Sequence, residues 1–431
     1  MELPVLEEQV DTARRAGAKG CELLLEVTTG VDLVMVGRKV VERTAVEEHH
    51  LTVTTWVDGG GRGQAKGRPD AVEALIAKAL QAAGKAAVDP HGGPVDRLRP
   101  VVGGLSIEDR RYKHLDDEGR TEVLELAVRS VQSESSKVRA GRFTYSDRST
   151  QRRFANSRGV SLEERSTRYD ARGEVSAGGV ELSESIASRS FASIASLPFG
   201  TSLTRRALAL LDDGETLDGE VPVMMPPHVV ARLVAFLGPY FVPERLSGER
   251  PFFLARRGDE PVVDARLHLL DDGRIPGGLH TRSFDDRGVV PVPLTLLKEG
   301  VPDAAYRGPE AARRDGVLPT GHEVGGTHVP GNLALRSGTK TVNHTWTDFA
   351  DWSLRLDDLD PTGLDLATGV LETEIDGLVM HSNEPKGALR RRKARLDLST
   401  MLNAVREVCS DTDRVGHVDA PALFLDGLVL L

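Results

Sequence analysis

The sequence predicts an α+β protein that is rich in strands and has helices between them. Hydrophobic residues make up 39% of the 431 residues, which is enough for real cores. Aromatic residues contribute only 4%, so those cores must consist mainly of Leu, Val and Ala. The 44 glycines indicate many sharp turns between short elements. Together these observations favour strands with intervening helices, in two or three domains at roughly 100–200 residues each.

Residues 1–100 are predicted to form an α/β domain. A short charged helix is expected from about Leu6 to Ala16. Three β-type runs follow it, at Glu22–Val27, Val31–Val36 and His50–Val57. Apolar residues at i, i+3, i+4 and i+7 then predict an amphipathic helix from Val72 to Ala83.

The helix predicted at Val72–Ala83 has its own boundary signals. Asp70 can cap its N-terminus, and Glu73, three residues on, can complete a capping box. Gly84 is a plausible residue for its end. These signals make it the best defined helix of the first region.

Residues 101–215 are predicted to form a middle helix-and-strand domain. A Pro- and Gly-rich stretch at Asp89–Gly104 is interpreted as the linker to it. A helix is expected at about Thr121–Val131, followed by antiparallel strands that include Phe143–Ser146 and Arg165–Ala171. Residues 182–211 are predicted to be helical again, with a break near Pro198.

Residues 216–431 are predicted to form a β-rich, barrel-like domain. One helix is expected after Pro226-Pro227, with Val230, Leu233 and Leu237 among its apolar residues. Most of the remainder has the pattern of short strands and Gly/Pro turns, which favours a curled sheet. A helix at about Thr400–Val408 and a strand at Ala422–Leu425 are expected near the end.

Charge and composition exclude several classes of partner. The net charge of −10 argues against nucleic acid, because proteins that bind phosphate backbones usually carry the opposite balance. The basic run Arg390–Arg395 follows a turn-like Asn383–Pro385 and is interpreted as a solvated face.

Two cysteines, Cys21 and Cys409, cannot build a disulfide framework or a Cys-rich zinc site. The N-terminus lacks the basic and apolar regions of a signal peptide. No stretch approaches the 18 or so apolar residues that span a bilayer, so we expect a cytoplasmic protein without a membrane partner.

Two motifs in the first region have plain structural interpretations. The glycine cluster at Asp58–Gly63 lacks the Lys-Ser/Thr ending of a phosphate-binding loop, so a flexible hairpin turn is the default. His49 and His50 are adjacent on a predicted strand, where neighbouring side chains point to opposite faces. We therefore do not expect them to bind one metal ion.

Complete catalytic motifs are missing from the rest of the sequence. His322 and His328 are six residues apart around two glycines, which does not fit the His-Glu-x-x-His helix of zinc peptidases, although a loop could still bring both rings together. His228 opens a helix but is followed by Val229 rather than a general-base Glu. There is no Gly-x-Ser-x-Gly nucleophile motif, and Cys409 has no convincing partner.

Several segments, read in order, resemble the TldD/PmbA family, once called modulators of DNA gyrase. The resemblance covers most of the chain from about residue 20. The segments that carry it are the Asp58–Gly63 turn with the following helix, Phe154–Val160 with its Asn-Ser-x-Gly pattern, Pro261–Gly273, Ser283–Val289, Leu296–Val301, Ala420–Leu423 and Leu425–Leu428. In the segment that resembles the family's Phe-Asp-Asp-Glu-Gly-Val signature, Arg287 stands in place of the usual Glu.

The resemblance implies a fold and a role. The fold would have an α/β N-terminal domain, a middle helix-and-strand segment and a twisted antiparallel barrel-like C-terminal domain. TldD-type subunits carry His-Glu-x-x-x-His and a late Cys in a Cys-Gly-Lys stretch, and bind zinc. Because no second His follows His228, and Cys409 lacks that context, this chain is similar to the PmbA/TldE type.

A PmbA/TldE-type chain would be the non-catalytic subunit of a zinc peptidase complex that acts on unfolded or small peptides. It would hold no cofactor or metal itself, and its TldD-type partner would supply zinc and the general base. We predict that His280, Asp285, His322, Glu323 and Asn156 line the peptide cleft. The family pattern does not say what Arg287 does there.

Two other interpretations stay open at the level of sequence. The first is a stand-alone hydrolase with an atypical metal site drawn from His228, His322, His328 and Cys409. The second is a homodimeric peptide-binding or regulatory protein without peptidase activity.

Overall fold

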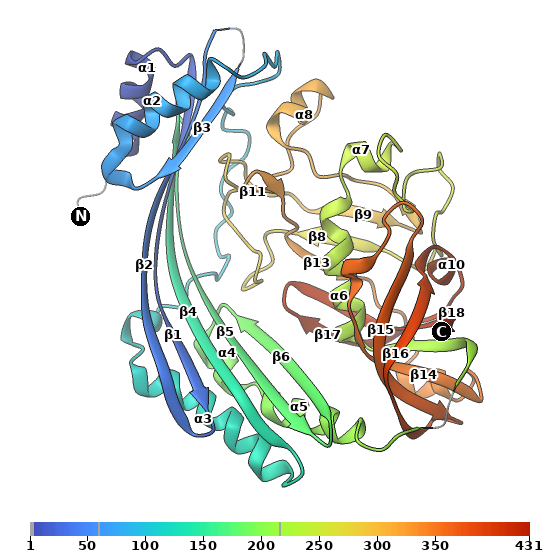
Figure 1. Ribbon diagram of the computed structural model, residues 1–431. Coiled ribbons are helices and arrows are strands. Elements are labelled where there is room, and N and C mark those ends of the chain that lie inside the picture. Colours follow the sequence, from blue (N-terminus) through green and yellow to red (C-terminus); the bar gives the residue numbers. More distant parts are fainter. Residues whose placement is uncertain (1–3, 59–60, 215–216) are drawn as a thin grey trace.

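The computed structural model describes residues 4–58, 61–214 and 217–431, and has two parts (Figure 1). A long, curved sheet with flanking helices forms the first part, and the C-terminal body, residues 217–431, lies on one side of it. The α+β class predicted from the sequence is confirmed. The centre of the glycine turn predicted at Asp58–Gly63 lies outside the described residues.

The curved sheet has six antiparallel strands in the order β3-β2-β1-β4-β5-β6. Their bounds are β1 Gly20–Val36, β2 Lys39–Trp56, β3 Arg62–Gly67, β4 Arg139–Asn156, β5 Ser161–Ala177 and β6 Val180–Ser188. The two runs predicted at Glu22–Val27 and Val31–Val36 are therefore one strand. Gly30 joins them, and a Cβ there would lie 2.0 Å from the Asp147 carbonyl oxygen of β4. Because glycine has no Cβ, β1 and β4 can pair without a break at Gly30, where the sequence pattern predicted two separate strands.

Alternation along the strands gives the six-stranded sheet one apolar and one polar face. Odd-numbered residues of β1, such as Leu23 and Leu33, pack beneath helices at the two ends of the sheet. Even-numbered residues of β1, β4 and β5, such as Glu22, Arg152 and Glu164, contact the C-terminal body instead. The polar face is thus the one that meets the body.

Helices cover the apolar face at both ends (Figure 1). At one end are α1 Leu6–Arg15 and α2 Val72–Ala83, and at the other are α3 Asp117–Glu134 and α5 Phe199–Ala209. The predicted capping box of α2 is wrong. A short 3₁₀ turn at Pro69–Ala71 precedes the helix, and no side chain caps it.

The segment predicted to be helical at residues 182–211 is only partly so. Its start belongs to strand β6, whose partner β5 holds it in the sheet. The helices α4 Phe191–Ser196 and α5 follow, separated at Pro198 as predicted. Because β1 of the first predicted domain pairs with β4 of the second, one sheet spans both. The boundaries at residues 100 and 215 stay a prediction.

The C-terminal body contains a ten-stranded sheet. Its strands are β7 Gly219–Met225, β8 Leu269–Asp272, β9 Leu294–Lys298, β10 Val301–Pro302, β13 Asn332–Leu335, β14 Trp352–Leu359, β15 Val370–His381, β16 Glu384–Asp397, β17 Val405–Val415 and β18 Val418–Leu430. Strand β7 pairs with both β14 and β18, which closes the ring β7-β14-β15-β16-β18. The barrel-like form is confirmed, but the sheet is mixed rather than purely antiparallel, since β7 with β14 and β13 with β18 are parallel.

Helix α6 Pro227–Leu237 lies against this curled sheet and contributes Val230, Leu233 and Leu237 to its core, as the sequence predicted. The helix predicted at Thr400–Val408 is wrong beyond its first turn. Helix α10 covers only Leu398–Asn403, and β17 then pairs with β18. No helix in the described ranges is long and apolar enough to cross a membrane.

The basic run lies on β16, and its arginines are half-buried or exposed. Three of them pair with carboxylates: Arg390 with Asp213, Arg392 with Asp218, and Arg395 with Glu372. These pairs neutralise much of the run, in agreement with a solvated protein face.

Candidate functional site

The loops that connect β8 to β9 and β9 to β13 bring polar residues of the C-terminal body against the polar face of the six-stranded sheet. Arg287 lies at the centre of the first cluster and is only 2% exposed. Its guanidinium donates to Glu22 of β1 at 2.7 Å and to Glu310 of α8 Pro309–Arg314 at 3.0 and 3.1 Å. Glu323 lies 3.5 Å away. One arginine thus neutralises carboxylates from the sheet and the body.

The charges around Arg287 set its protonation. Although burial opposes the charged form, the carboxylates of Glu22, Glu310 and Glu323 raise the pKa of Arg287 well above its usual value. Arg287 in turn lowers the pKa of Glu310 against the effect of burial. The Arg287 guanidinium also lies 5.4 Å from the centre of the Trp56 ring. A permanent buried cation therefore occupies the position where the family pattern has Glu.

A second arginine makes the reciprocal contact. Arg152 belongs to β4 of the sheet and donates to the Phe284 carbonyl oxygen of the body at 3.0 Å. It also pairs with Asp286 of the body and with Glu26 of β1, the latter at 3.3 Å. Phe284 packs on Phe154 next to this contact, with ring centres 6.3 Å apart. Arg287 and Arg152, one from each part, together form what we call the arginine clamp.

Two predicted cleft residues, Asp285 and Asn156, hold turns beside the clamp. The Asp285 carboxylate accepts backbone N–H groups of Arg287, Val289 and Glu323 at 2.9–3.0 Å. Burial raises the pKa of Asp285 to about 7. The Asn156 side chain donates to the Val95 carbonyl oxygen at 2.8 Å and accepts the N–H of Val160 at 3.1 Å. Both side chains are enclosed, so these contacts order the loops around them.

His280 is half-buried, and the carbonyl oxygen of the neighbouring Leu279 accepts Arg189, just after β6, at 2.6 Å. Its ring stacks on that of His417, with centres 3.8 Å apart and planes inclined by 9°. Burial, followed by the proximity of His417, lowers the pKa of His280 to about 3. Burial also lowers the pKa of His417 to about 4. Both rings are therefore neutral at neutral pH, and sequence reasoning had not singled out His417.

His322 lies deeper, beside Asp271 and Tyr306. The hairpin of β11 Glu323–Val324 and β12 Thr327–His328 places His322 and His328 on either side of the Gly325-Gly326 turn. The Tyr306 ring centre is 4.9 Å from that of His322 and 6.3 Å from that of His328. The loop therefore gathers both imidazoles around one tyrosine, as the sequence left open.

Asp271 is the acid of this second cluster. It accepts the Tyr306 hydroxyl at 2.7 Å, and its carboxylate lies 3.4 Å from His322 Nε2, a contact too poorly aligned for a hydrogen bond. Although burial opposes ionisation, His322 and Tyr306 lower the pKa of Asp271. Asp271 Oδ1, both His322 ring nitrogens and His328 Nδ1 have no hydrogen-bond partner among the described residues.

The four residues of the atypical metal site lie in three separate environments. His228 Nε2 contacts the Asp357 carbonyl oxygen at 2.9 Å, and Cys409 lies in an apolar core beside Thr345. His322 and His328 surround Tyr306, as described above. Within residues 4–58, 61–214 and 217–431, no group of three or more His, Cys, Asp or Glu side chains could hold a metal ion.

The sequence-predicted residues thus lie in three places. Asn156, Asp285 and Glu323 lie around the arginine clamp, His322 lies in the Asp271 cluster, and His280 stacks on His417. Their role as cleft residues stays a prediction. The sequence analysis missed Glu22, Arg152 and Glu310. Of these residues only Glu22 gave a signal in the sequence, because it is a charged residue within the apolar run of β1.

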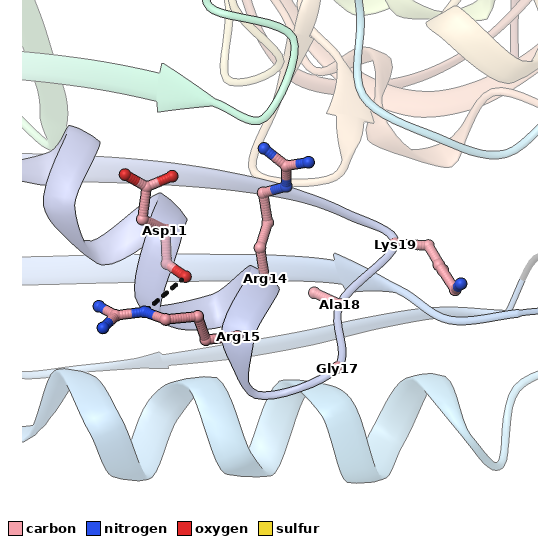
Figure 2. Close-up of a pocket in the computed structure, with 6 residues that line it drawn as sticks. All are labelled: Asp11, Arg14, Arg15, Gly17, Ala18 and Lys19. Carbon is pink, nitrogen blue, oxygen red and sulfur yellow. Dashed lines mark hydrogen bonds between the residues drawn. The ribbon is translucent and has the colours of Figure 1, made fainter.

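A broad surface hollow of about 770 Å³ lies elsewhere, at the end of α1. Figure 2 shows that the side chains of Arg14, Arg15 and Lys19 point in different directions rather than towards one point. Arg15 Nε donates to the Asp11 carbonyl oxygen of its own helix at 3.4 Å. Because the basic groups do not converge, we do not regard this hollow as the functional site.

Comparisons with known proteins agree on one family. A model of the PmbA/TldA metallopeptidase central domain matches residues 104–211, and a model of the C-terminal domain matches residues 218–430. No curated protein gave a match.

Three solved structures share the fold over nearly their whole lengths. A candidate modulator of a DNA gyrase from Thermotoga maritima aligns with a TM-score of 0.87 at 17% identity, over 99% of both chains. A second candidate modulator of DNA gyrase, from Bacteroides thetaiotaomicron, aligns with a TM-score of 0.83 at 18% identity, over 98% of this chain and 97% of that one. TldE from Thermococcus kodakarensis aligns with a TM-score of 0.80 at 14% identity, over 99% of this chain and 100% of that one.

Proposed function

Because this chain belongs to the PmbA/TldD metallopeptidase family, we propose that it is a TldE-type, non-catalytic subunit of a two-subunit peptidase. It would pair with a TldD-type chain that holds the zinc ion and the general base. The complex would act on unfolded or small peptides. Similarity in fold to TldE from Thermococcus kodakarensis supports this assignment.

The environment of helix α6 is the observation that carries the proposal. In the family's His-Glu-x-x-x-His spacing, His228 is followed by Val229 at the Glu position and Leu233 at the second His position. Val229 and Leu233 are 1% and 3% exposed and belong to the core of the body. Apolar side chains that are buried in this way stabilise the barrel but offer no ligand to a metal.

Electrostatics at His228 also disfavour a cation. Arg206 of α5 pairs with Asp357 at 2.8 Å next to the histidine. Burial, and then the positive charge of Arg206, lower the pKa of His228. A guanidinium already satisfies the nearby carboxylate, so a divalent ion would meet repulsion instead of a free acidic ligand.

The role left to this chain is to shape the space in which a peptide lies. The polar face of the sheet carries the ion pairs Arg148–Asp32 and Arg168–Asp170, at 2.8 and 2.7 Å. Such a surface can hydrogen-bond an extended peptide without hydrolysing it. His280 is half-buried next to a backbone segment that contacts Arg189 at the end of this sheet, which supports its assignment as a cleft residue.

Co-expression with the TldD-type chain of the same genome tests the proposal. We expect the two chains to co-purify in equal amounts, with zinc bound by the complex and peptide cleavage that requires both chains. Stoichiometric zinc and peptide hydrolysis by the unmodified chain alone would contradict the proposal and favour a stand-alone hydrolase.

A further inference from the structure

A small hollow lies where one end of the six-stranded sheet meets the C-terminal body. It has a volume of about 330 Å³, which suits a small molecule. Its lining includes Val180 and Glu181 at the start of β6, Asp376 of β15, and Arg390 and Arg391 of β16. None of these residues belongs to the arginine clamp or to the Asp271 cluster, so the hollow is a separate place in the fold.

Backbone contacts fix the walls of the hollow relative to each other. The segment after α5 pairs with β16, where the Ala388 N–H donates to the Asp212 carbonyl oxygen at 2.7 Å and the Gly214 N–H donates to the Ala388 carbonyl oxygen at 2.9 Å. Asp213 and Arg390 form an ion pair beside these bonds. A ligand would therefore meet a preformed site, and its binding would require little ordering of the protein.

Arg391 has an unusual backbone conformation at this site. Its φ angle is 46°, in the left-handed region that residues other than Gly rarely adopt. The register between β15 and β16 shifts here, and the Arg391 N–H donates to the Asp376 carboxylate at 2.8 Å. Strained backbone is common at binding sites, where it positions a side chain. Here it holds the exposed Arg391 beside the hollow.

The charged groups that line the hollow have both signs. Asp213 and Arg390 pair with each other and leave no net charge. Arg391 and Glu181 form no ion pair with residues 4–58, 61–214 and 217–431. One cation and one carboxylate therefore stay available to a ligand.

Asp376 is a second carboxylate that would gain from a cation. Burial raises its pKa, and the negative charges of Asp358 and Asp357 raise it further. Those two acids already have partners, because Asp357 pairs with Arg206 and Asp358 pairs with Arg232. Among the described residues, Asp376 has no such ion pair.

Two simpler kinds of ligand fit this arrangement poorly. A bare anion would approach the carboxylates of Glu181 and Asp376 together with Arg391. A metal ion would need several ligands of the right type, and the described part of the chain has no group of three or more His, Cys, Asp or Glu side chains that could hold one. A molecule that carries one positive and one negative group can satisfy both signs at once.

We propose that the hollow binds a short zwitterion, namely a free amino acid or a dipeptide, whose carboxylate pairs with Arg391 and whose ammonium group pairs with Asp376 and Glu181. Hydrolysis of small peptides releases such molecules, so their source as products rests on the proposed function, whereas the charge pattern does not. The proposal adds a product-binding site, apart from the predicted cleft residues, that would join β6 to β15 and β16.

Titration of this chain with alanylalanine tests the charge pattern. We expect saturable binding by ligand-observed NMR, with a Kd in the millimolar range for so small a ligand. N-acetyl-alanylalanine and alanylalanine amide each lack one charge, and each should bind at least about tenfold more weakly. Free alanine is titrated in parallel. Whichever of the two zwitterions binds more tightly identifies the size of the ligand, and either result supports the proposal.

Substitutions at the two charged partners give a second measurement. R391M and D376N should each weaken the binding of alanylalanine by at least about tenfold. R395M is the matched control, because Arg395 lies on the same strand and pairs with Glu372 at 3.1 Å outside the hollow. Circular dichroism confirms that the variants are folded.

R391G separates binding from stability, because Gly adopts a positive φ angle without strain. This variant should melt no lower than the wild type and still lose alanylalanine binding. Equal binding by R391G, R391M and the wild type would overturn the proposal, and so would equal binding of the N-acetyl analogue. A wild-type chain that shows no saturable binding of either zwitterion would also contradict it. None of these results bears on the proposed function, which co-purification with the TldD-type chain tests separately.

Discussion

The charge state of single residues in this protein depends strongly on their neighbours. His280 and His417 are ordinary histidines in the sequence, yet burial and mutual stacking keep both neutral. Arg287 differs from the family pattern by charge, and its three carboxylate partners explain how the protein accommodates it. A residue that departs from a family motif in charge can thus be accommodated by neighbours of the opposite charge.

The stacked histidines predict acid sensitivity. Their pKa values of about 3 and 4 lie below the usual 6.5, so the unfolded chain binds these protons first as pH falls. The stability they contribute is therefore present above pH 6.5 and is lost as pH falls from 6.5 towards 4 and 3. Replacing His417 with Phe keeps the stacking but removes one titrating ring.

Between pH 7.5 and pH 5 the unfolding free energy of H417F should fall less than that of the wild type. Below the usual histidine pKa, the difference should grow by up to about 1.4 kcal/mol per pH unit, because the variant has one titrating ring fewer. Urea unfolding at both pH values measures this difference. H114F, at an exposed histidine, is the control and should behave like the wild type. An equal acid response of H417F and wild type would show that the stack does not exclude protons.

Elements in this fold are positioned by close backbone approaches. Strand β3 lies so near α2 that a Cβ on Gly63 would be 2.1 Å from the Ala79 carbonyl oxygen and 2.2 Å from the Ala83 nitrogen. These are backbone atoms of a helix, which cannot move independently. Gly63 therefore determines how closely α2 packs on the edge of the sheet.

G63A should destabilise the protein by about 1–3 kcal/mol, because the added methyl group forces α2 away from β3. Thermal unfolding followed by circular dichroism measures the loss. G103A is the matched control, since a Cβ at Gly103 has no atom within 4 Å. Similar melting temperatures for G63A and the wild type would mean that the strand and the helix can separate at little cost.

At the scale of the whole molecule, the arginine clamp and a shared apolar core join the sheet to the body. The clamp is reciprocal, because Arg152 of the sheet binds the body and Arg287 of the body binds the sheet. Next to it lies a small apolar cluster of Leu24, Phe154, Val160 and Phe284. A larger apolar cluster also contains residues of both parts, among them Leu203 of α5 and Phe424 of β18. Buried charges therefore supplement an apolar junction.

Removing the clamp should weaken the contact between the two parts. In R152M/R287M the partner carboxylates remain buried without a cation, which costs about 3–5 kcal/mol for each broken cluster. We expect the variant to unfold at a lower temperature than the wild type, measured by calorimetry. R165M/R172M, at two exposed positions of β5, is the control and should melt like the wild type. An unchanged melting temperature in R152M/R287M would show that the apolar core shared by both parts is sufficient to couple them.

The sequence by itself determined the α+β class, the helices at Leu6–Arg15, Val72–Ala83 and Pro227–Leu237, and the barrel-like C-terminal region. These follow from local periodicity and turn residues, which act over a few neighbouring positions. Only the tertiary structure decided that β1 and β4 join two predicted domains in one sheet, and that residues 405–415 form a strand. Strand pairing depends on partners that are distant in the chain.

The candidate site shows the same limit. The sequence indicated Asn156, Asp285, His280, His322 and Glu323 by type and motif, but not their contacts. Glu22 and Arg287 are 265 positions apart and meet only because the body packs on the polar face of the sheet. Local patterns specify which side chains are present, whereas the packing of the two parts decides which charges are buried together.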